Sequence, residues 1–372
     1  MKKFFILFAT ALFSTTLIAQ QSNRKVQVAI LFDTSNSMDG LIDQAKSRIW
    51  NIVNEVSSLT YNGVAPDMEF ALYHYGNDNL KPKENYIEQV LGLTSDLDLL
   101  SEKLFGLTTN GGSEFCGAVI GRSLDDLKWS NDPSDLKMIY IAGNEPFNQG
   151  PVDFKVVCKK AAEKGVYINT IYCGPYEQGV REFWKDGADC SEGDFFNIDS
   201  DKEVVHIKTP YDSAIDQYND SLNQTYIGYG SIGSERKRAQ IAQDSNAESQ
   251  SMSVKAERAV FKSKGGRAYN NASWDLIDAV DNGKDIDDIE EEELPEEFQG
   301  KTKEEKEALI DEKKQDRKRY QEAISDLAKK RQAFIDEEMK RRAEQGLDEE
   351  DDFGNAVNES IIDKAKEVGF DK

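Results

Sequence analysis

The chain has 372 residues, enough for two or three structural units, and a formal net charge of −23. This strong negative charge argues against nucleic acid and against anionic membrane surfaces as partners. Hydrophobic residues make up 38% of the sequence and charged residues 31%, so one ordinary core is expected rather than a core along the whole length.

The first residues have the pattern of a secretory signal peptide. Lys2 and Lys3 form a short basic region, residues 4–13 form an apolar run, and Ala19 suits the last position before cleavage. The apolar run is shorter than the roughly 20 residues that a membrane-spanning helix needs. We therefore expect residues 1–19 to be removed. The mature protein is expected to be exported to the periplasm or the cell exterior and to contain no membrane span.

Predicted strands and helices alternate in the next part of the chain. The nearly continuous apolar run Val26–Phe32 predicts a strand that is buried on both faces, as in a parallel sheet. Further strands are expected at residues 68–75, 86–91, 137–142, 166–173 and 194–198. Helices are expected at residues 40–56, 96–104, 118–127, 153–164, 178–185 and 211–222. This alternation predicts right-handed βαβ units, and hence an α/β domain over residues 25–225 with helices on both faces of its sheet.

The chain becomes polar after this domain. Residues 230–284 are expected to form a helical extension, with one long helix over residues 234–261. Ser273 is a candidate N-cap for a short helix that follows it, with the sequence WDLIDAV. The acidic run at residues 285–300 has the composition of a solvated linker.

A long charged helix is expected over residues 301–346. Thr302 and Glu305 have the spacing of a capping box, which predicts the start of this helix. Arg331 falls on the apolar side of the helix, which favours packing on neighbouring helices of the chain over a long coiled coil. Residues 347–372 are expected to form a loose acidic tail.

The most informative motif is the turn DTSNS, which directly follows the first predicted strand. It brings the carboxylate of Asp33 near the hydroxyls of Ser35 and Ser37 at the carboxyl end of a strand, where open α/β sheets bind ligands. Such hard oxygen ligands suit a divalent cation, Mg²⁺ above all, with Mn²⁺ and Ca²⁺ as alternatives. The competing interpretation is an Asx or Ser turn that caps the next helix. The buried strand before the motif and the amphipathic helix after it favour a metal site.

At this motif the chain resembles the von Willebrand factor A (vWA) domain family. The segment VAILFDTSNSMDG is similar to the first strand and the metal-ion-dependent adhesion site (MIDAS) motif of that family. The segments TTNGGSEFCG and IYIAGNEPFNQG more narrowly resemble a group of bacterial secreted vWA-domain proteins. The resemblance covers about residues 26–222. It implies a six-strand, mostly parallel sheet flanked by helices, a bound divalent cation and a protein ligand.

Two positions depart from the family pattern. After the Gly-rich turn, Glu114 stands where the family has Thr, and Gly143 stands where the family has Asp at the end of the fourth strand. One carboxylate is lost and another gained, so Asp33 and Glu114 would keep two carboxylates at the site. A directly bound Glu114 would reduce the positive charge that the cation offers to an acidic ligand. The alternative role for Glu114 is a carboxylate facing a helix N-terminus.

The predicted metal ligands are therefore Asp33, Ser35, Ser37 and Glu114. The neighbouring side chains Ser113, Asn144 and Glu145 are secondary candidates. Glu145 is an alternative ligand, whereas Asn144 is more suited to supporting its turn.

Four cysteines, Cys116, Cys158, Cys173 and Cys190, lie in the α/β region. Cysteines of an exported protein can form disulfides, and the absence of a CxxC spacing argues against a zinc site. The sequence does not choose among the possible pairings, and buried free thiols remain the alternative. No base partner is evident for Cys116, so a catalytic thiol is not expected.

The sequence carries no recognisable catalytic constellation. His74 and His206 are the only histidines, and no GxSxG, HExxH or P-loop pattern occurs. We therefore expect a protein that is not an enzyme. It would bind a protein partner through the cation site. Alternatively, it is a structural or assembly protein of the cell envelope whose metal site is degenerate and whose helical C-terminal region makes the contacts.

Overall fold

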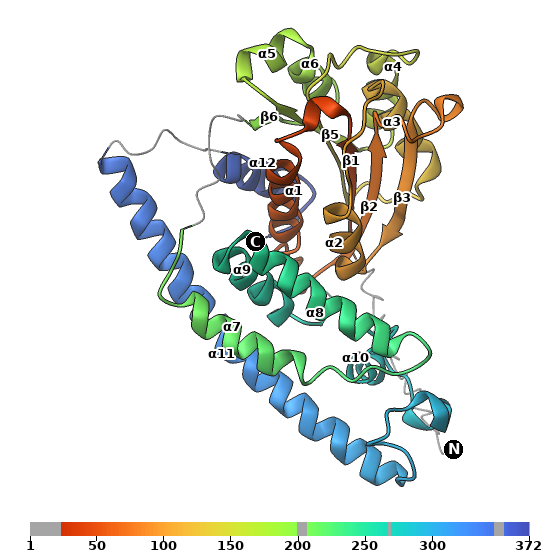
Figure 1. Cartoon of the computed structure of the whole chain (residues 1–372), viewed down its shortest axis with the longest axis vertical. Helices are drawn as coiled ribbons and strands as arrows, with labels where there is room; N and C mark the ends of the chain where they lie inside the picture. Colours follow the sequence, from red (N-terminus) through yellow and green to blue (C-terminus); the bar gives the residue numbers. More distant parts are fainter. Residues whose placement is uncertain (1–23, 199–206, 267–268, 346–352, 372) are drawn as a thin grey trace, which may run out of the picture.

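The computed structural model describes residues 24–198, 207–266, 269–345 and 353–371. The predicted signal peptide, residues 1–19, and His206 lie outside the described residues. An α/β domain occupies one end of the molecule, and long helices run beneath it toward the other end (Figure 1).

The described α/β domain contains a six-stranded sheet with the order β3-β2-β1-β4-β5-β6. The strands are β1 (Lys25–Asp33), β2 (Asp67–Tyr75), β3 (Ile87–Thr94), β4 (Leu136–Gly143), β5 (Tyr167–Cys173) and β6 (Phe195–Ile198). β1 lies between β2 and β4, and every neighbouring pair is parallel except β2 with β3. The predicted six-strand, mostly parallel sheet is confirmed.

Helices cover both faces of this sheet, which explains the continuous apolar runs in its central strands. Alternate side chains of β1 enter two different apolar clusters: Ile30 packs with α1, and Leu31 packs with α3. The helices of this domain are α1 (Ile42–Val56), α2 (Leu97–Phe105), α3 (Cys116–Asp126), α4 (Phe154–Glu163), α5 (Tyr176–Arg181) and α6 (Trp184–Asp189). The helix α7 (Asp212–Asn223), which was expected to close this domain, packs instead against α9 (Met252–Ser263) and α11 (Lys303–Glu344) (Figure 1). The single helix expected over residues 178–185 is wrong, because Phe183 adopts a left-handed conformation with φ of 66° and separates α5 from α6.

The C-terminal part is helical, as predicted, but its elements differ in detail. They are α8 (Gly233–Gln250), α9 (Met252–Ser263), α10 (Leu276–Asp281), α11 (Lys303–Glu344) and α12 (Phe353–Glu367). The expected single helix over residues 234–261 breaks at Ser251, whose backbone is extended and whose side chain accepts a hydrogen bond from the Val254 amide at 3.1 Å. Asp275, rather than Ser273, caps α10 by accepting from the Asp278 amide.

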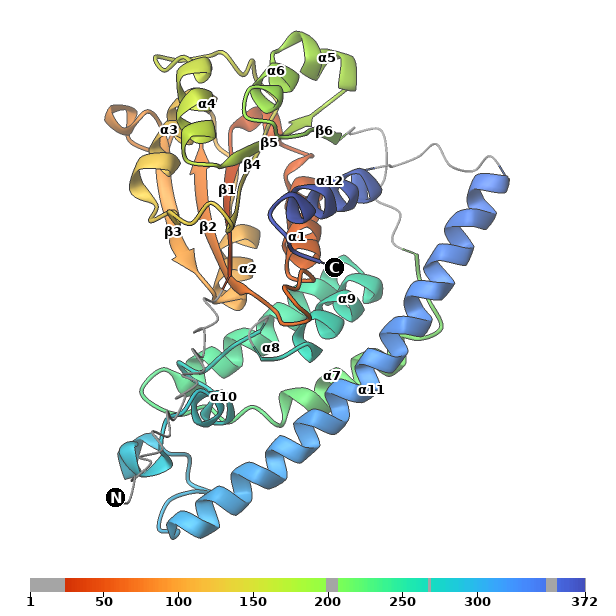
Figure 2. The ribbon, with the colours of Figure 1, turned by 180° about the vertical axis from the view of Figure 1, so that it is seen from behind.

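Helix α11 begins at the predicted capping box. The Thr302 amide donates to the Glu305 carboxylate at 2.9 Å, and the Glu305 amide donates to the Thr302 hydroxyl at 3.3 Å. The helix packs against α7 and α9 of its own chain, as the sequence favoured (Figure 2). Arg331 is buried there in ion pairs with Asp212 and Glu257.

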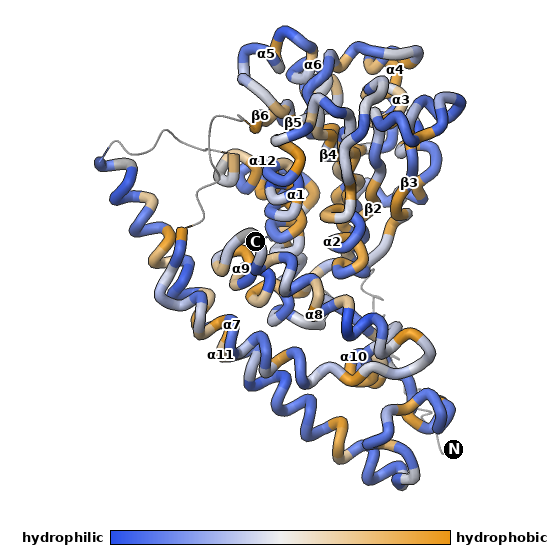
Figure 3. The backbone as a smooth tube through the Cα atoms, viewed as in Figure 1, coloured by the Kyte–Doolittle hydropathy of each residue, from blue (hydrophilic) through white to orange (hydrophobic). Residues whose placement is uncertain are grey.

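Two segments that were expected to be solvated are packed instead. Residues 285–300 contain the 3-10 helices η3 (Ile286–Asp288) and η4 (Glu291–Glu293), and their apolar side chains join a buried cluster with α10. The expected acidic tail contains α12, which packs on α1 and β6 and buries Val357 and Ile361. In both segments hydrophobic residues stand among the hydrophilic ones (Figure 3), and several of them, such as Leu294 and Val357, are buried.

Within the described ranges, no helix combines the length and the apolar composition that crossing a membrane requires.

Candidate functional site

The DTSNS turn begins where β1 ends, at the centre of the carboxyl edge of the sheet. Asp33 and Ser35 are buried, whereas Ser37 is exposed in the 3-10 helix η1 (Asn36–Met38). The Ser35 amide donates to Asp33 Oδ1 at 2.8 Å, which holds the turn against the carboxylate. The other oxygen, Asp33 Oδ2, is buried and has no hydrogen-bond partner. An unpaired buried carboxylate oxygen is costly, and a cation is a group that could satisfy it.

The two serine hydroxyls are linked to the loop that follows β4. Ser35 Oγ and Ser37 Oγ lie 2.7 Å apart, and Ser37 Oγ donates to Asn144 Oδ1 at 2.8 Å. Asn144 Nδ2 in turn donates to the Ser37 carbonyl at 2.9 Å. Asn144 therefore holds the β4–α4 loop and the DTSNS turn together.

Glu114 approaches Asp33 across a glycine that the sequence analysis did not single out. A Cβ atom added to Gly76 would lie 2.8 Å from Glu114 Cγ and 2.9 Å from Asp33 Oδ1. Gly76 follows β2 directly and has a left-handed φ of 74°, which also favours glycine. Its place after a strand next to β1 is the sequence signal that could have identified it. The structure thus brings Glu114, which is buried, beside the Asp33 carboxylate.

The position of Gly143, where the family has Asp, has no room for a side chain. A Cβ atom there would lie 2.7 Å from the Tyr75 hydroxyl and 2.9 Å from Asp33 Oδ2. Tyr75 is fully buried and donates to the Ala142 carbonyl at 3.1 Å. The tyrosine hydroxyl occupies space that an acidic side chain at position 143 would need.

The site has a negative electrostatic environment. Burial raises the pKa of Asp33 to about 7, and the charges of Glu114 and Glu145 add to this effect. Burial also raises the pKa of Glu114 to about 7, with further contributions from Glu145 and Asp78. Both carboxyl groups are therefore more costly to ionise than in water, which favours uptake of a positive charge at this point.

Further side chains brace the turn from the β2 side. Asn77 Nδ2 donates to the carbonyls of Thr34 and Thr108, both at 3.1 Å, and so joins two loops of the site. His74 is half-buried between the Thr34 hydroxyl at 3.1 Å and the Glu88 carboxylate at 2.9 Å. These contacts make His74 and Asn77 supports of the backbone between Asp33 and Ser35.

A cation here would depend on oxygen donors of several kinds. Within the described residues, no group of three or more His, Cys, Asp or Glu side chains is arranged to hold a metal. Around Asp33, however, the hydroxyls of Ser35 and Ser37 and the Glu114 carboxylate supply the hard oxygen set that suits Mg²⁺. Ser113 is half-buried in the loop before α3. The Glu145 carboxylate accepts a hydrogen bond from the Gln149 side chain at 3.3 Å. The residues present therefore fit a small divalent cation.

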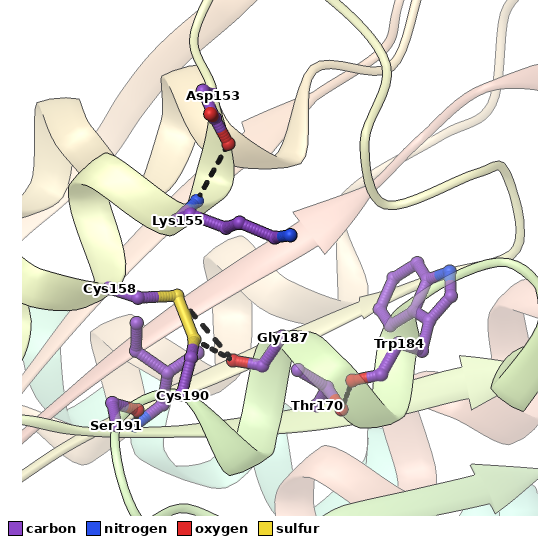
Figure 4. Close-up of a disulfide and its surroundings, with 9 residues drawn as sticks. Asp153, Lys155, Cys158, Thr170, Trp184, Gly187, Cys190 and Ser191 are labelled. Carbon is purple, nitrogen blue, oxygen red and sulfur yellow. Dashed lines mark hydrogen bonds between the residues drawn. A yellow bond between two sulfur atoms is a disulfide. The ribbon is translucent and has the colours of Figure 1, made fainter.

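The cysteines divide into one disulfide and two free thiols. Cys158 of α4 is bonded to Cys190, which directly follows α6 (Figure 4). Cys116 and Cys173 are free and buried, and the Cys116 sulfur lies 3.7 Å from the Tyr75 hydroxyl. Burial raises the pKa of both free thiols, which disfavours the reactive thiolate form.

Comparison with known proteins finds similar folds among solved structures. The sequence matches no family model and no curated protein. It is similar in structure to the conserved hypothetical protein BatB from Bacteroides thetaiotaomicron, with 17% identity, a TM-score of 0.36, and 47% of this chain and 90% of BatB covered. The SpRpn10 VWA domain has 17% identity and a TM-score of 0.37, with 49% of this chain and 90% of that domain covered.

A third similar structure is proximal thread matrix protein 1 from the mussel byssus, with a zinc-occupied MIDAS motif. It has 15% identity and a TM-score of 0.36, with 48% of this chain and 43% of that protein covered. At such identities the likeness concerns the fold alone. The strand order and the position of the DTSNS turn at the end of central β1 agree with the expected architecture. The chain has a vWA-like α/β fold, followed by a helical C-terminal region.

Proposed function

We propose that this chain is an exported vWA-domain protein that binds a protein partner through a divalent cation held at the DTSNS turn. The observation that carries the proposal is the buried, unpartnered oxygen of Asp33 beside two serine hydroxyls at the exposed carboxyl edge of the sheet. The signal-peptide pattern of residues 1–19 supports export. The role is binding rather than catalysis, because no nucleophile and base were found together in the sequence.

Asp33, Ser35, Ser37 and Glu114 would hold the cation, with Mg²⁺ as the first candidate. When bound, the cation supplies a position at which an oxygen atom of the partner completes its coordination. The chain's own residues orient that position: Asn144 fixes the Ser37 hydroxyl. Gly76 allows Glu114 to reach the Asp33 carboxylate.

The acidic surroundings restrict the chemistry of the partner. Glu145 and Asp78 add negative charge next to Asp33 and Glu114, and the whole chain has a net charge of −23. A strongly acidic partner surface would be repelled by this field. The site is therefore suited to a neutral or weakly charged segment that offers a hydroxyl, amide or carbonyl oxygen.

Calorimetric titration with Mg²⁺, Mn²⁺ and Ca²⁺ tests the cation part of the proposal. Wild type is expected to bind at least one of these ions, Asp33→Ala to lose binding, and Glu114→Ala to bind roughly 10-fold or more weakly. The matched control is Asp363→Ala, which removes an exposed carboxylate remote from the turn. No heat of binding in wild type would sink the cation proposal, and unchanged affinity in Glu114→Ala would remove Glu114 from the ligand set.

A second candidate role is assembly in the cell envelope through the helical region. The observation that favours it is that two isoleucines of this region are exposed to solvent: Ile232, just before α8, is 42% exposed, and Ile241, on α8, is 45% exposed. Pull-downs with and without a chelator distinguish the two roles. Partner loss on chelation or on Asp33→Ala supports the cation site, whereas loss only on Ile232→Ser with Ile241→Ser supports assembly through α8.

A further inference from the structure

We propose that the Cys158–Cys190 disulfide is a positioning element of the candidate site, because it holds the loop that carries Asn144 and Glu145. This inference rests on the proposed function above. The bridge joins α4 to the end of α6, and the loop lies against both helices. The bonded cysteines would act through Phe147 rather than by contact with a cation or partner.

Helix α6 depends on tertiary contacts for its position. It has only six residues, Trp184–Asp189, and an isolated helix of that length is not stable in water. Its first residue, Trp184, is fully buried, and its carbonyl accepts a hydrogen bond from the Thr170 hydroxyl at 2.8 Å (Figure 4). Its other end is held by the disulfide, whose sulfur atoms lie 3.9 and 3.1 Å from the Gly187 carbonyl oxygen.

The ring of Phe147 fills the space between the two helices that the disulfide joins. It packs edge-on against Phe154 of α4, with 5.3 Å between ring centroids, and against Trp184 of α6, with 5.1 Å. A Cβ atom added to Gly187 would lie only 2.3 Å from this ring, so the α6 backbone at Gly187 also approaches Phe147 closely. The separation of α4 and α6, which the bridge restrains, therefore sets the place of Phe147.

Contacts at and just before the start of α6 also hold the backbone of residues 145–147, which lies next to the candidate site. The Trp184 indole N–H donates to the Glu145 carbonyl at 2.8 Å, and the Phe147 amide donates to the Glu182 carbonyl at 2.9 Å. Asn144 is adjacent in sequence and makes the two hydrogen bonds to Ser37 described above. A shift of α6 would be transmitted through residues 144–147 to the serine hydroxyls.

Loss of the disulfide is expected to weaken metal affinity about as much as loss of other contacts that support metal ligands. Removal of a group that orients a metal ligand typically weakens metal affinity by about 10- to 100-fold. We expect the lower part of this range, because Asn144 would keep its hydrogen-bonding groups and lose only its restraint. A disulfide that served stability alone would change the melting temperature and leave the affinity of the folded protein unchanged.

The test compares wild type with the double variant Cys158→Ser/Cys190→Ser in the full chain. Mn²⁺ titration is expected to show affinity weakened by about 10-fold in the double variant. Hydrogen exchange is expected to be faster at residues 143–150 and unchanged at residues 108–113, which border the site from the other side. Ile310→Ala is the matched control: it opens the remote cluster around α10, and should lower stability without changing either readout.

The outcomes separate this inference from the proposed function. If wild type binds none of Mg²⁺, Mn²⁺ and Ca²⁺, the cation proposal fails, and exchange at residues 143–150 still decides the inference. The inference is overturned if the double variant exchanges at the wild-type rate at residues 143–150. It is also overturned if wild type binds Mn²⁺ and the double variant binds it equally well. If the double variant does not fold, Phe147→Leu with the disulfide intact replaces it. The same faster exchange at 143–150 is then expected, and its absence overturns the inference.

Discussion

At the scale of single residues, the space around Asp33 decides which side chains can share the site. Gly76 on one side leaves room for Glu114, and Gly143 on the other side lies against the Tyr75 hydroxyl. The two departures from the family pattern are thus coupled to their surroundings. The missing carboxylate at position 143 is accompanied by a buried tyrosine, and the added carboxylate at position 114 depends on a glycine.

The substitution Gly143→Asp tests this packing argument. The new Cβ would lie 2.7 Å from the Tyr75 hydroxyl, so we expect a loss of about 1–3 kcal/mol in the free energy of unfolding, measured in urea. Mg²⁺ affinity is not expected to rise. The double variant Gly143→Asp/Tyr75→Phe should recover part of the lost stability, because the clashing oxygen is removed. A single variant that is as stable as wild type and binds Mg²⁺ more tightly would contradict the argument.

At the scale of elements, buried ion pairs attach the helical region to the α/β domain. Arg258 of α9 pairs with Asp98 of α2 and with Asp244 of α8, the latter at 2.8 Å. Lys262, which is fully buried, also contacts Asp244 at 2.8 Å. Because buried charges are costly unless paired, these contacts specify how α8 and α9 sit on α2.

The pH dependence of stability should reflect Asp244. Burial alone would raise the pKa of this carboxyl, but Lys262 and Arg258 outweigh burial and hold it well below its usual range. The ionised carboxylate therefore contributes fully above its ordinary pKa of 3.8, and the contribution is lost as the pH falls below that value. Urea unfolding across this range is expected to show a steeper acid loss in wild type than in Asp244→Asn.

Near neutral pH, Asp244→Asn is expected to cost about 3–5 kcal/mol, since it leaves the buried Lys262 without its carboxylate and leaves Arg258 with Asp98 alone. The control for the pH dependence is Asp363→Asn, because the Asp363 side chain is exposed beside Lys366. It should leave both the stability and its pH dependence nearly unchanged. If the free energy of unfolding falls equally steeply with decreasing pH in wild type and in Asp244→Asn, the ion pairs of Asp244 do not cause the loss of stability in acid.

At the scale of the whole molecule, one apolar cluster runs through both parts of the chain. It includes Val28 and Ile30 of β1, Phe261 of α9, and Val357 and Ile361 of α12. The C-terminal helix therefore completes the core of the α/β domain rather than trailing from it. Residues far apart in sequence share this core, which favours cooperative unfolding.

Scanning calorimetry of the mature chain is expected to give one transition whose calorimetric and van't Hoff enthalpies agree. Ile361→Ala, which empties a buried site on α12, should move that entire transition to lower temperature and cost about 2–5 kcal/mol. The exposed Ile241→Ala on α8 is the matched control and should have little effect. Two transitions, of which only one moves, would mean that the parts unfold independently.

The sequence by itself determined the features that depend on near neighbours in the chain. The apolar run before Asp33 predicted β1 and the turn after it, and the pair Thr302 and Glu305 predicted the start of α11. The alternation of strands and helices predicted the sheet. Hydrophobic periodicity and helix capping involve residues a few positions apart, so both can be recognised in the sequence alone.

The tertiary structure decided the features that depend on distant residues. The Cys158–Cys190 pairing spans 32 positions, and the contact of Gly143 with Tyr75 joins β4 to β2. The burial of α12, expected as a loose tail, depends on its meeting α1 and β6. Each of these outcomes depends on which surfaces the folded chain brings into contact. Composition and spacing along the sequence do not contain that information, because close packing is decided between elements.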